Sequence, residues 1–313
     1  MTKKNATRIA YGEALKILAE TNKDVVVLDA DLSKSTKTET FKKACPERFF
    51  NVGIAEQDLI GVSAGLAAAG KIPFASSFAM FAAGRAYEII RNSVAYPKLN
   101  VKIAATHAGI TVGEDGASHQ MLEDLSLMRT IPNMVVLNPA DEVEAKAAVL
   151  AAAAYVGPVY IRLGRMEVPT IFDEATYQFE IGKGVVIEEG TDVTLVATGI
   201  MVAAAVEARE ILAAEGISAR IVNIHTIKPL DNHIIIESAE KTGALVTAEE
   251  HSIYGGLGSA VSEVVVANKL VPVEVVGVKD TFGESGIPSD LLEKYGLTAK
   301  DLVAAAKKAI SRK

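Results

Sequence analysis

Short β-branched runs alternate with alanine-rich segments through about the first 165 residues. The apolar runs are nearly continuous, which is typical of strands in a parallel sheet that is covered on both faces. The pattern predicts strands at 24–28, 101–105, 134–137 and 159–162. It predicts helices between them, at 10–21, 56–69, 81–93 and 141–153. This alternation favours a doubly wound α/β domain with a parallel sheet.

The pattern changes after this first part of the chain. A segment around Pro169 has no clear period and is predicted to be a surface linker. Residues 184–188 and 193–198 then resemble a hairpin that leads into a second α/β unit. Further strands are expected at 219–224, 244–248 and 273–278, with helices at 202–214, 231–241, 258–268 and 299–311. We therefore predict two doubly wound domains, 1–166 and a smaller one at 183–313, joined by a linker at 167–182.

Composition and charge exclude several classes of protein. Half of the 313 residues are hydrophobic and 23% are charged, so the chain can bury a large core. The net charge of −7 disfavours nucleic acid as a partner, but it does not exclude a local basic pocket that binds a small phosphate. Cys45 is the only cysteine, and the N-terminus shows no apolar targeting segment, which predicts a cytoplasmic protein. The longest uncharged run, 147–161, is too short to cross a membrane.

Candidate chemistry lies in segments that follow predicted strands, where the sites of open α/β sheets gather. In the segment NVGIAEQ (51–57), a glycine turn precedes Glu56 at the start of an apolar helix. A glutamate there favours the helix dipole or serves catalysis, and the residues alone leave both readings open. In PFASSFAMF (73–81), Phe78 and Phe81 are spaced to share one side of a helix turn. They form either core or a stacking platform for a flat ring.

The loop HAGITVGEDGASHQ (107–120) gathers histidines, carboxylates and glycines behind a predicted strand. A structural loop and a zinc site made by His107, Asp115 and His119 are alternatives, but a compact zinc motif is absent. We favour a polar site for hydroxyls and phosphate, in which a histidine moves protons near neutral pH.

Taken together, these three segments resemble the C-terminal half of transketolase, which comprises a pyrimidine-binding domain and a small C-terminal domain. EEHSIYGGLGSAVSE and GIPSDLLEKYGL extend the resemblance into the second domain, so that it runs from Arg8 to the end of the chain. The resemblance implies an enzyme that uses thiamine diphosphate. Its reaction would move a two-carbon ketol unit from a ketose phosphate to an aldose phosphate.

The resemblance also implies roles in cofactor binding. Glu56 matches the glutamate that contacts N1′ of the cofactor's aminopyrimidine ring and so promotes formation of the reactive ylid. Phe81 matches the ring that stacks on the pyrimidine, with Phe78 beside it, and Asp31 matches a position near the thiamine. Gly84 stands where the family commonly has a tyrosine at the pyrimidine edge, which puts that contact in doubt.

Further positions match the substrate site of the family. His107, Asp115 and His119 match residues that contact the hydroxyls of the sugars, and both histidines are expected to be catalytic with Glu56. Arg8, Ser35 and Arg165 match the sugar-phosphate site, with Arg162 as an alternative to Arg165. Paired arginines suit a phosphate dianion because guanidinium forks make charge-assisted hydrogen bonds.

One motif of the family is missing from this sequence. The cofactor's diphosphate and its divalent metal are held in the family by an N-terminal domain with a Gly-Asp-Gly…Asn motif, and the segment 113–116 (GEDG) differs from it. We therefore expect one subunit of a split transketolase. A separate N-terminal subunit would hold most of the Mg²⁺ ligands in an α2β2 assembly, and no metal ligand is expected from this chain. The C-terminal part of a deoxyxylulose-phosphate synthase, a 2-oxoacid dehydrogenase β-subunit and a non-catalytic paralogue are the alternatives.

Overall fold

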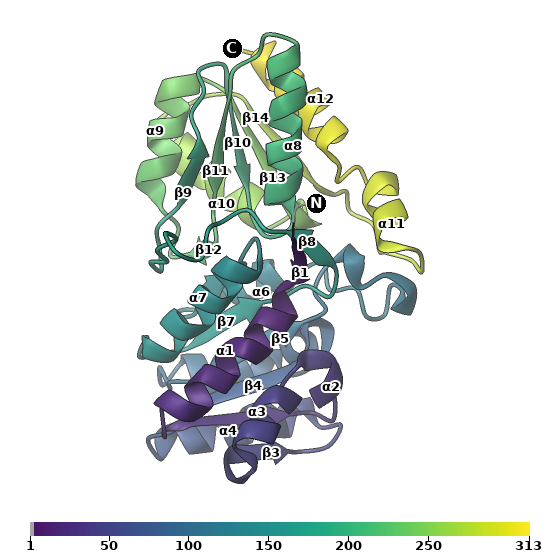
Figure 1. Ribbon diagram of the computed structural model, residues 1–313. Helices are drawn as coiled ribbons and strands as arrows, with labels where there is room; N and C mark the ends of the chain where they lie inside the picture. The colour runs from purple at the N-terminus through teal and green to yellow at the C-terminus, as the bar shows by residue number, and fades with distance from the viewer. Residues whose placement is uncertain (1–2) are drawn as a thin grey trace.

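The computed structural model describes residues 3–313 and shows two α/β units, each built on its own sheet (Figure 1). A short antiparallel pair lies between them, made by β1 (Lys4–Ala6) and β8 (Glu167–Pro169). The predicted linker therefore contains a strand that ties the start of the chain to the junction. The sheets are mostly parallel, which confirms the predicted α/β class. The exact domain boundaries stay predictions.

The first unit contains a seven-stranded sheet in the order β12-β6-β7-β5-β4-β2-β3. Its strands are β2 (Val25–Asp29), β3 (Phe49–Asn51), β4 (Ile72–Phe78), β5 (Lys102–Thr106), β6 (Val135–Leu137), β7 (Val159–Arg162) and β12 (Thr226–Lys228). All neighbours are parallel except β12, which comes from the second half of the chain and pairs antiparallel with β6. Every residue of β2, β5 and β7 is buried, and this explains why those runs are mostly apolar, with charged residues (Asp29, Lys102 and Arg162) only at the strand ends.

Helices cover both faces of this sheet. Val25 and Val27 of β2 belong to a core with α1 and α7, whereas Val26 and Leu28 face the core that contains α4. The helices of this unit are α1 (Thr7–Thr21), α2 (Ser33–Thr36), α3 (Glu39–Ala44), α4 (Glu56–Ala68), α5 (Tyr87–Ile89), α6 (Asp124–Thr130) and α7 (Glu142–Ala154). π-helical turns flank α5 at Met80–Arg85 and Ile90–Ala95, where a regular helix was predicted.

The second unit contains a five-stranded sheet in the order β14-β13-β10-β11-β9. Its strands are β9 (Val185–Glu188), β10 (Val193–Ala197), β11 (Ala219–Asn223), β13 (Leu245–Ser252) and β14 (Val273–Val278). The predicted hairpin of β9 with β10 is wrong, because β11 lies between them and β9 pairs antiparallel with β11. The fully buried β10 takes a central position, and the partly exposed β9 takes the edge.

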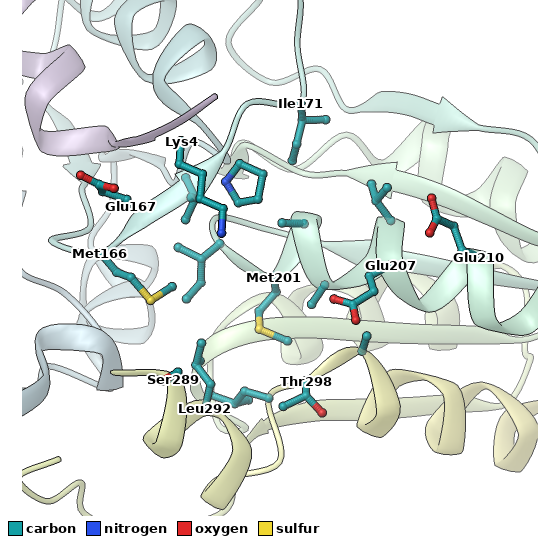
Figure 2. A pocket seen from close by; sticks show the side chains of 18 of the residues that line it. Lys4, Met166, Glu167, Ile171, Met201, Glu207, Glu210, Ser289, Leu292 and Thr298 are labelled. Carbon is teal, nitrogen blue, oxygen red and sulfur yellow. The ribbon is translucent and has the colours of Figure 1, made fainter. Parts of the chain in front are cut away.

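The second unit has helices around this sheet and one helix, at 288–294, that packs against residues 110–115 of the first unit. These helices are α8 (Met201–Ala214), α9 (Asn232–Thr242), α10 (Leu257–Asn268), α11 (Pro288–Lys294) and α12 (Ala299–Ile310). A groove of about 990 Å³ lies at the junction, between β8, α8 and the start of α12 (Figure 2). Apolar residues such as Met201 and Leu292 line it, and Glu207 and Glu210 make it acidic, so it does not suit a phosphate. In the described part of the chain, no helix has the length and apolarity that a bilayer requires.

Candidate functional site

The carboxyl ends of five adjacent strands, β3, β2, β4, β5 and β7, carry the predicted site residues. Glu56 follows β3, Asp31 follows β2, Phe81 follows β4, His107 follows β5 and Arg165 follows β7. Because these strands are parallel, their carboxyl ends meet at one edge of the sheet. Segments that are up to 157 residues apart in the sequence, such as Thr7 and Gly164, therefore meet there.

Glu56 is the first residue of α4, and its side chain is only 3% exposed. Gly53, with a φ of +76°, makes the turn that brings the chain from β3 into this helix. The Arg85 guanidinium donates to Oε2 of Glu56 at 2.8 Å and also lies 5.0 Å above the Phe81 ring. Arg85 was not predicted, since a lone arginine in a helical stretch reads as a solvated charge. The acid is therefore buried beside an aromatic ring and not part of an ordinary surface pair.

The aromatic residues pack together across two elements. Phe78 is the last residue of β4, whereas Phe81 lies in the π-helical turn, so the predicted shared helix turn is wrong. Their rings still stack, with centroids 6.1 Å apart. Phe78 also stacks on the His107 imidazole at 3.8 Å, and the edge of His119 meets Phe81 at 5.2 Å. The partly exposed Phe81 leaves ring surface for a flat ligand.

His107 is buried, with a φ of +56° just after β5. Its Nε2 lies 3.1 Å from Nη1 of Arg8, and its Nδ1 lies 2.9 Å from Oγ1 of Thr106. Because a guanidinium only donates, Nε2 accepts and the proton of the neutral ring sits on Nδ1. Burial, together with the positive charges of Arg8 and Arg165, lowers the pKa of His107 to about 3. With this pKa, His107 does not fit the expectation of a loop histidine that moves protons near neutral pH.

Arg8 and Arg165 form a positive cluster next to His107. Arg8 donates to the carbonyl oxygen of Ser35 at 2.9 Å, and its buried Nε lacks a hydrogen-bond partner within residues 3–313. Burial and the nearby Arg165 lower the pKa of Arg8. Arg165 donates to the carbonyl of Val112 at 2.7 Å and lies 3.5 Å from the Asp115 carboxylate. An anion placed here would gain two guanidinium partners.

Arg162 lies away from this cluster. It is 4% exposed and its Nε donates to the Asp124 carboxylate at 2.9 Å, inside the core between the units. Of the two alternatives for the phosphate, the structure therefore places only Arg165 at the site.

The turn after β2 is organised by Asp29, which the sequence did not single out. Its buried carboxylate accepts hydrogen bonds from the amide of Leu32 and from the hydroxyls of Thr36 and Thr38. These bonds hold the segment that carries Ser35. Asp31 itself is exposed, has a φ of +64° and pairs with the Asn51 side chain through two hydrogen bonds. Only part of this pattern is local: the bond to the Leu32 amide, three residues on, is typical of side-chain capping of a turn, whereas Thr36 and Thr38 lie seven and nine residues after Asp29.

Across residues 3–313, no three His, Cys, Asp or Glu side chains gather closely enough to hold a metal ion. The zinc alternative at His107, Asp115 and His119 therefore finds no support in the geometry.

A buried carboxylate, an aromatic platform and a pair of arginines lie at one edge of a parallel sheet, an arrangement typical of an α/β domain that binds a flat heterocyclic ligand. Residues 3–170 match the family model described as "Transketolase, pyrimidine binding domain", and residues 182–302 match "Transketolase, C-terminal domain". The chain therefore belongs to the transketolase family. Membership implies thiamine diphosphate as the cofactor.

Individual relatives agree with the family models. The chain is 55% identical to a "Putative transketolase C-terminal section" of Methanocaldococcus jannaschii, over 94% of this chain and 93% of the relative. It is 47% identical to the "6-deoxy-6-sulfo-D-fructose transketolase subunit SqwH" of a Clostridium species, over 98% and 95% of the two chains. A solved structure titled "Split gene transketolase, inactive beta4 tetramer" is 62% identical, with a TM-score of 0.93 over 98% of this chain and 99% of that one.

Proposed function

We propose that this chain is the C-terminal subunit of a two-chain transketolase. The reaction would transfer a two-carbon ketol unit from a ketose phosphate, such as xylulose 5-phosphate, to an aldose phosphate. The observation that carries the proposal is the burial of Glu56 beside Phe81, at the edge of the sheet where His107 and the arginine pair also lie. Acid, ring platform and anion site are thus within reach of one substrate–cofactor complex.

The side chains present fit the pyrimidine end of thiamine diphosphate. An aminopyrimidine needs a ring face and a carboxyl at its edge, and Phe81 and Glu56 lie close enough for one guanidinium to touch both. Glu56 would hold a proton at N1′, Phe81 would cover the ring with Phe78 behind it, and Asp31 would lie near the thiamine. When bound, the cofactor supplies the nucleophilic carbon of the reaction. The protein's part is to place it and to exclude water.

The substrate would occupy the space next to this ring platform. His107, His119 and Asp115 would contact sugar hydroxyls, and a neutral His107 would act through hydrogen bonds to them. Both histidines would be catalytic residues in the sense that they touch the reacting sugar. Arg8 and Arg165, with Ser35, would bind the terminal phosphate. The name of the Clostridium relative specifies a sulfonated ketose, and two guanidinium groups suit a sulfonate as well as a phosphate.

A separate N-terminal subunit would complete the active site. We assign the diphosphate and the Mg²⁺ to that subunit, because this sequence has no Gly-Asp-Gly…Asn motif. The similar structure is titled a split-gene transketolase in an inactive beta4 tetramer, which supports the idea that such a chain alone is inactive. For the complete enzyme we propose an α2β2 assembly with active sites between unlike subunits.

The test is reconstitution with the separately expressed chain that carries the Gly-Asp-Gly…Asn motif. With thiamine diphosphate and Mg²⁺, we expect ketol transfer between pentose phosphates by the mixture and negligible transfer by either chain alone. Full activity of this chain alone would overturn the two-subunit proposal. Decarboxylation of pyruvate without ketol transfer would instead indicate a synthase or dehydrogenase role. A sulfonated ketose in a parallel assay determines which anion the arginine pair prefers.

A further inference from the structure

The loop 109–120, which carries Asp115 and His119, packs against the second unit. Gln120 donates to the carbonyl oxygen of Glu284 at 2.9 Å and, within the loop, to that of Ile110 at 3.0 Å. A β-carbon added at Gly116 would lie 2.6 Å from the Ser285 hydroxyl, so the two backbones approach closely. The shape of the loop therefore depends on residues of the second unit.

Glu250 on β13 makes the most direct of these contacts. Its Oε1 accepts the amide of Thr111 at 2.6 Å, across 139 residues of sequence. A β-carbon at Gly109 would lie 2.2 Å from the Glu250 carboxyl carbon, and Gly109 has a φ of +84°. Only glycine admits the carboxylate at this distance and adopts this backbone conformation without strain. The carboxylate thus caps the start of the turn Ile110–Asp115.

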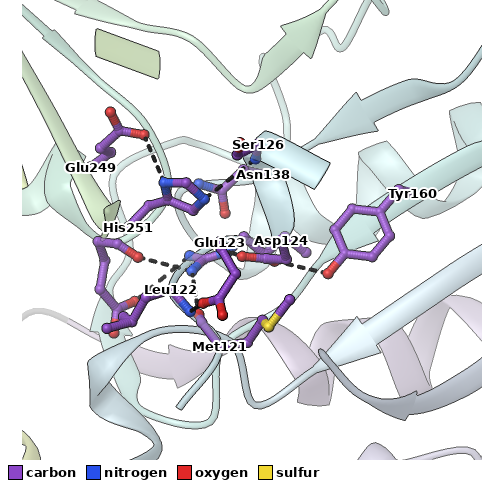
Figure 3. Close-up of polar contacts among 12 residues, drawn as sticks. Met121, Leu122, Glu123, Asp124, Ser126, Asn138, Tyr160, Glu249 and His251 are labelled. Carbon is purple, nitrogen blue, oxygen red and sulfur yellow. Dashed lines mark hydrogen bonds and ion pairs between the residues drawn. The ribbon is translucent and has the colours of Figure 1, made fainter. Parts of the chain in front are cut away.

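A buried ionic network holds Glu250 in place. Arg162 donates to the backbone oxygen of Glu250 at 2.8 Å, and its Nη1 lies 3.8 Å from the carboxylate. Asp124 accepts a hydrogen bond from Arg162. It also accepts one from the Tyr160 hydroxyl at 2.8 Å (Figure 3). Arg162, Asp124 and Glu250 are each at most 4% exposed. Burial is the main cause that raises the pKa of Glu250, with a smaller contribution from Asp124, and the Arg162 charge and the Thr111 hydrogen bond oppose that shift. A charge buried this deeply is stable only next to its partners, so the network fixes the positions of these three side chains.

We propose that Glu250 is a positioning residue of the active site. Through the Thr111 amide it fixes the loop 109–120 and thereby places Asp115 and His119 for the sugar, which gives the second unit a role in substrate binding. The inference rests on the proposed function, because it assumes that the loop contacts the sugar. Glu250 contacts the backbone of the loop through the Thr111 amide and is therefore not a catalytic residue.

The test compares Glu250→Ala and Glu250→Gln in the complex with the N-terminal chain. A hydrogen bond to a charged group contributes about 1.5–3 kcal/mol, which is roughly a tenfold to hundredfold effect. We therefore expect Glu250→Ala to raise the KM for the sugars at least about tenfold, with the cofactor dissociation constant within about twofold of wild type. Glu250→Gln keeps an oxygen that accepts the Thr111 amide, and most of the loss should be recovered.

Hydrogen exchange of the full chain gives a second readout that needs no activity. Exchange of the Thr111 amide should become about tenfold faster in Glu250→Ala and not in Glu249→Ala. Glu249 is the matched control because it is equally buried on β13 but caps α10 through Leu257 and Gly258. Wild-type exchange at Thr111 and wild-type KM values in Glu250→Ala would overturn the inference. Absence of ketol transfer in the wild-type complex would instead refute the proposed function, while the exchange experiment would still test the contact.

Discussion

The Glu56 carboxylate lies 2.8 Å from the Arg85 guanidinium, which also covers a face of the Phe81 ring. The side chain of Arg85 is 52% exposed and that of Glu56 is 3% exposed. Arg85 can therefore turn into solvent, while Glu56 is confined by its surroundings. A heterocycle that binds between Glu56 and Phe81 would replace the guanidinium as the partner of the acid.

Replacing Arg85 should destabilise the folded protein, because the buried Glu56 carboxylate would lose its cationic partner. Arg85→Met leaves the carboxylate without its cation, and we expect a loss of about 1 kcal/mol in the free energy of unfolding, since the arginine is half exposed. Combining Glu56→Gln with Arg85→Met should recover the lost stability, because the unpaired negative charge is then removed. Urea unfolding of the single and double variants measures this coupling. Arg91→Met, which removes an exposed arginine of the following π-helical turn, is the control. Additive effects of Arg85→Met and Glu56→Gln would disprove the pairing.

The stability of the chain should fall on acidification because of His107. Its pKa lies at about 3 in the folded protein, below the ordinary value of 6.5, so the unfolded state binds more protons between these two pH values. The neutral, buried His107 therefore contributes a stabilisation that is present above pH 6.5 and is lost as the pH falls towards 3. Between pH 7 and pH 5 we expect His107 to account for roughly 1–2 kcal/mol of the loss.

Urea unfolding at both pH values checks this expectation. His107→Gln should reduce the difference in unfolding free energy between pH 7 and pH 5. His233→Gln should leave it unchanged, because His233 lies exposed on α9. An equal pH dependence in wild type and His107→Gln would contradict a neutral, buried imidazole.

The arginine pair should act on the anionic end of the substrate. In the reconstituted complex, Arg165→Gln and Arg8→Gln should each raise the KM for a ketose phosphate by about tenfold to a hundredfold. The KM for the same ketose without its phosphate should change little. Steady-state kinetics with both donors measures the difference, and Arg312→Gln, at the exposed end of the chain, is the control. An equal effect on both donors would show that the pair does not bind the phosphate.

Elements that depend on local pattern could be predicted from the sequence. The buried strands β2 and β5 begin and end within one residue of the prediction, because a strand covered on both faces is apolar along most of its length and carries its charged residue at an end. The start of α4 at Glu56 followed from the glycine turn and the apolar helix behind it. The expectation that the segments of Glu56, Phe81 and His107 lie at one edge of the sheet followed from their place after strands, although β4 was not among the strands predicted by range.

Features that depend on distant partners could not be predicted. Nothing near β12 indicates that it leaves the second unit to pair with β6. Arg162 belongs to the core only because Asp124 and Glu250, which lie 38 and 88 residues away, satisfy it. The lowered pKa of His107 also depends on distant segments, since burial by the fold is its main cause and the charges of Arg8 and Arg165, from other elements, add to it. Local residue patterns do not indicate such pairings between distant segments.

The most direct measurement is the turnover of the reconstituted complex with Glu56→Gln. Glutamine keeps the size of the side chain but holds no acidic proton, so we expect kcat for ketol transfer to fall by at least about a hundredfold with the complex still assembled. Asp58→Asn, an exposed acid in the same first turn of α4, should retain wild-type turnover. Turnover of Glu56→Gln within about twofold of wild type would contradict a role of Glu56 in activating the cofactor.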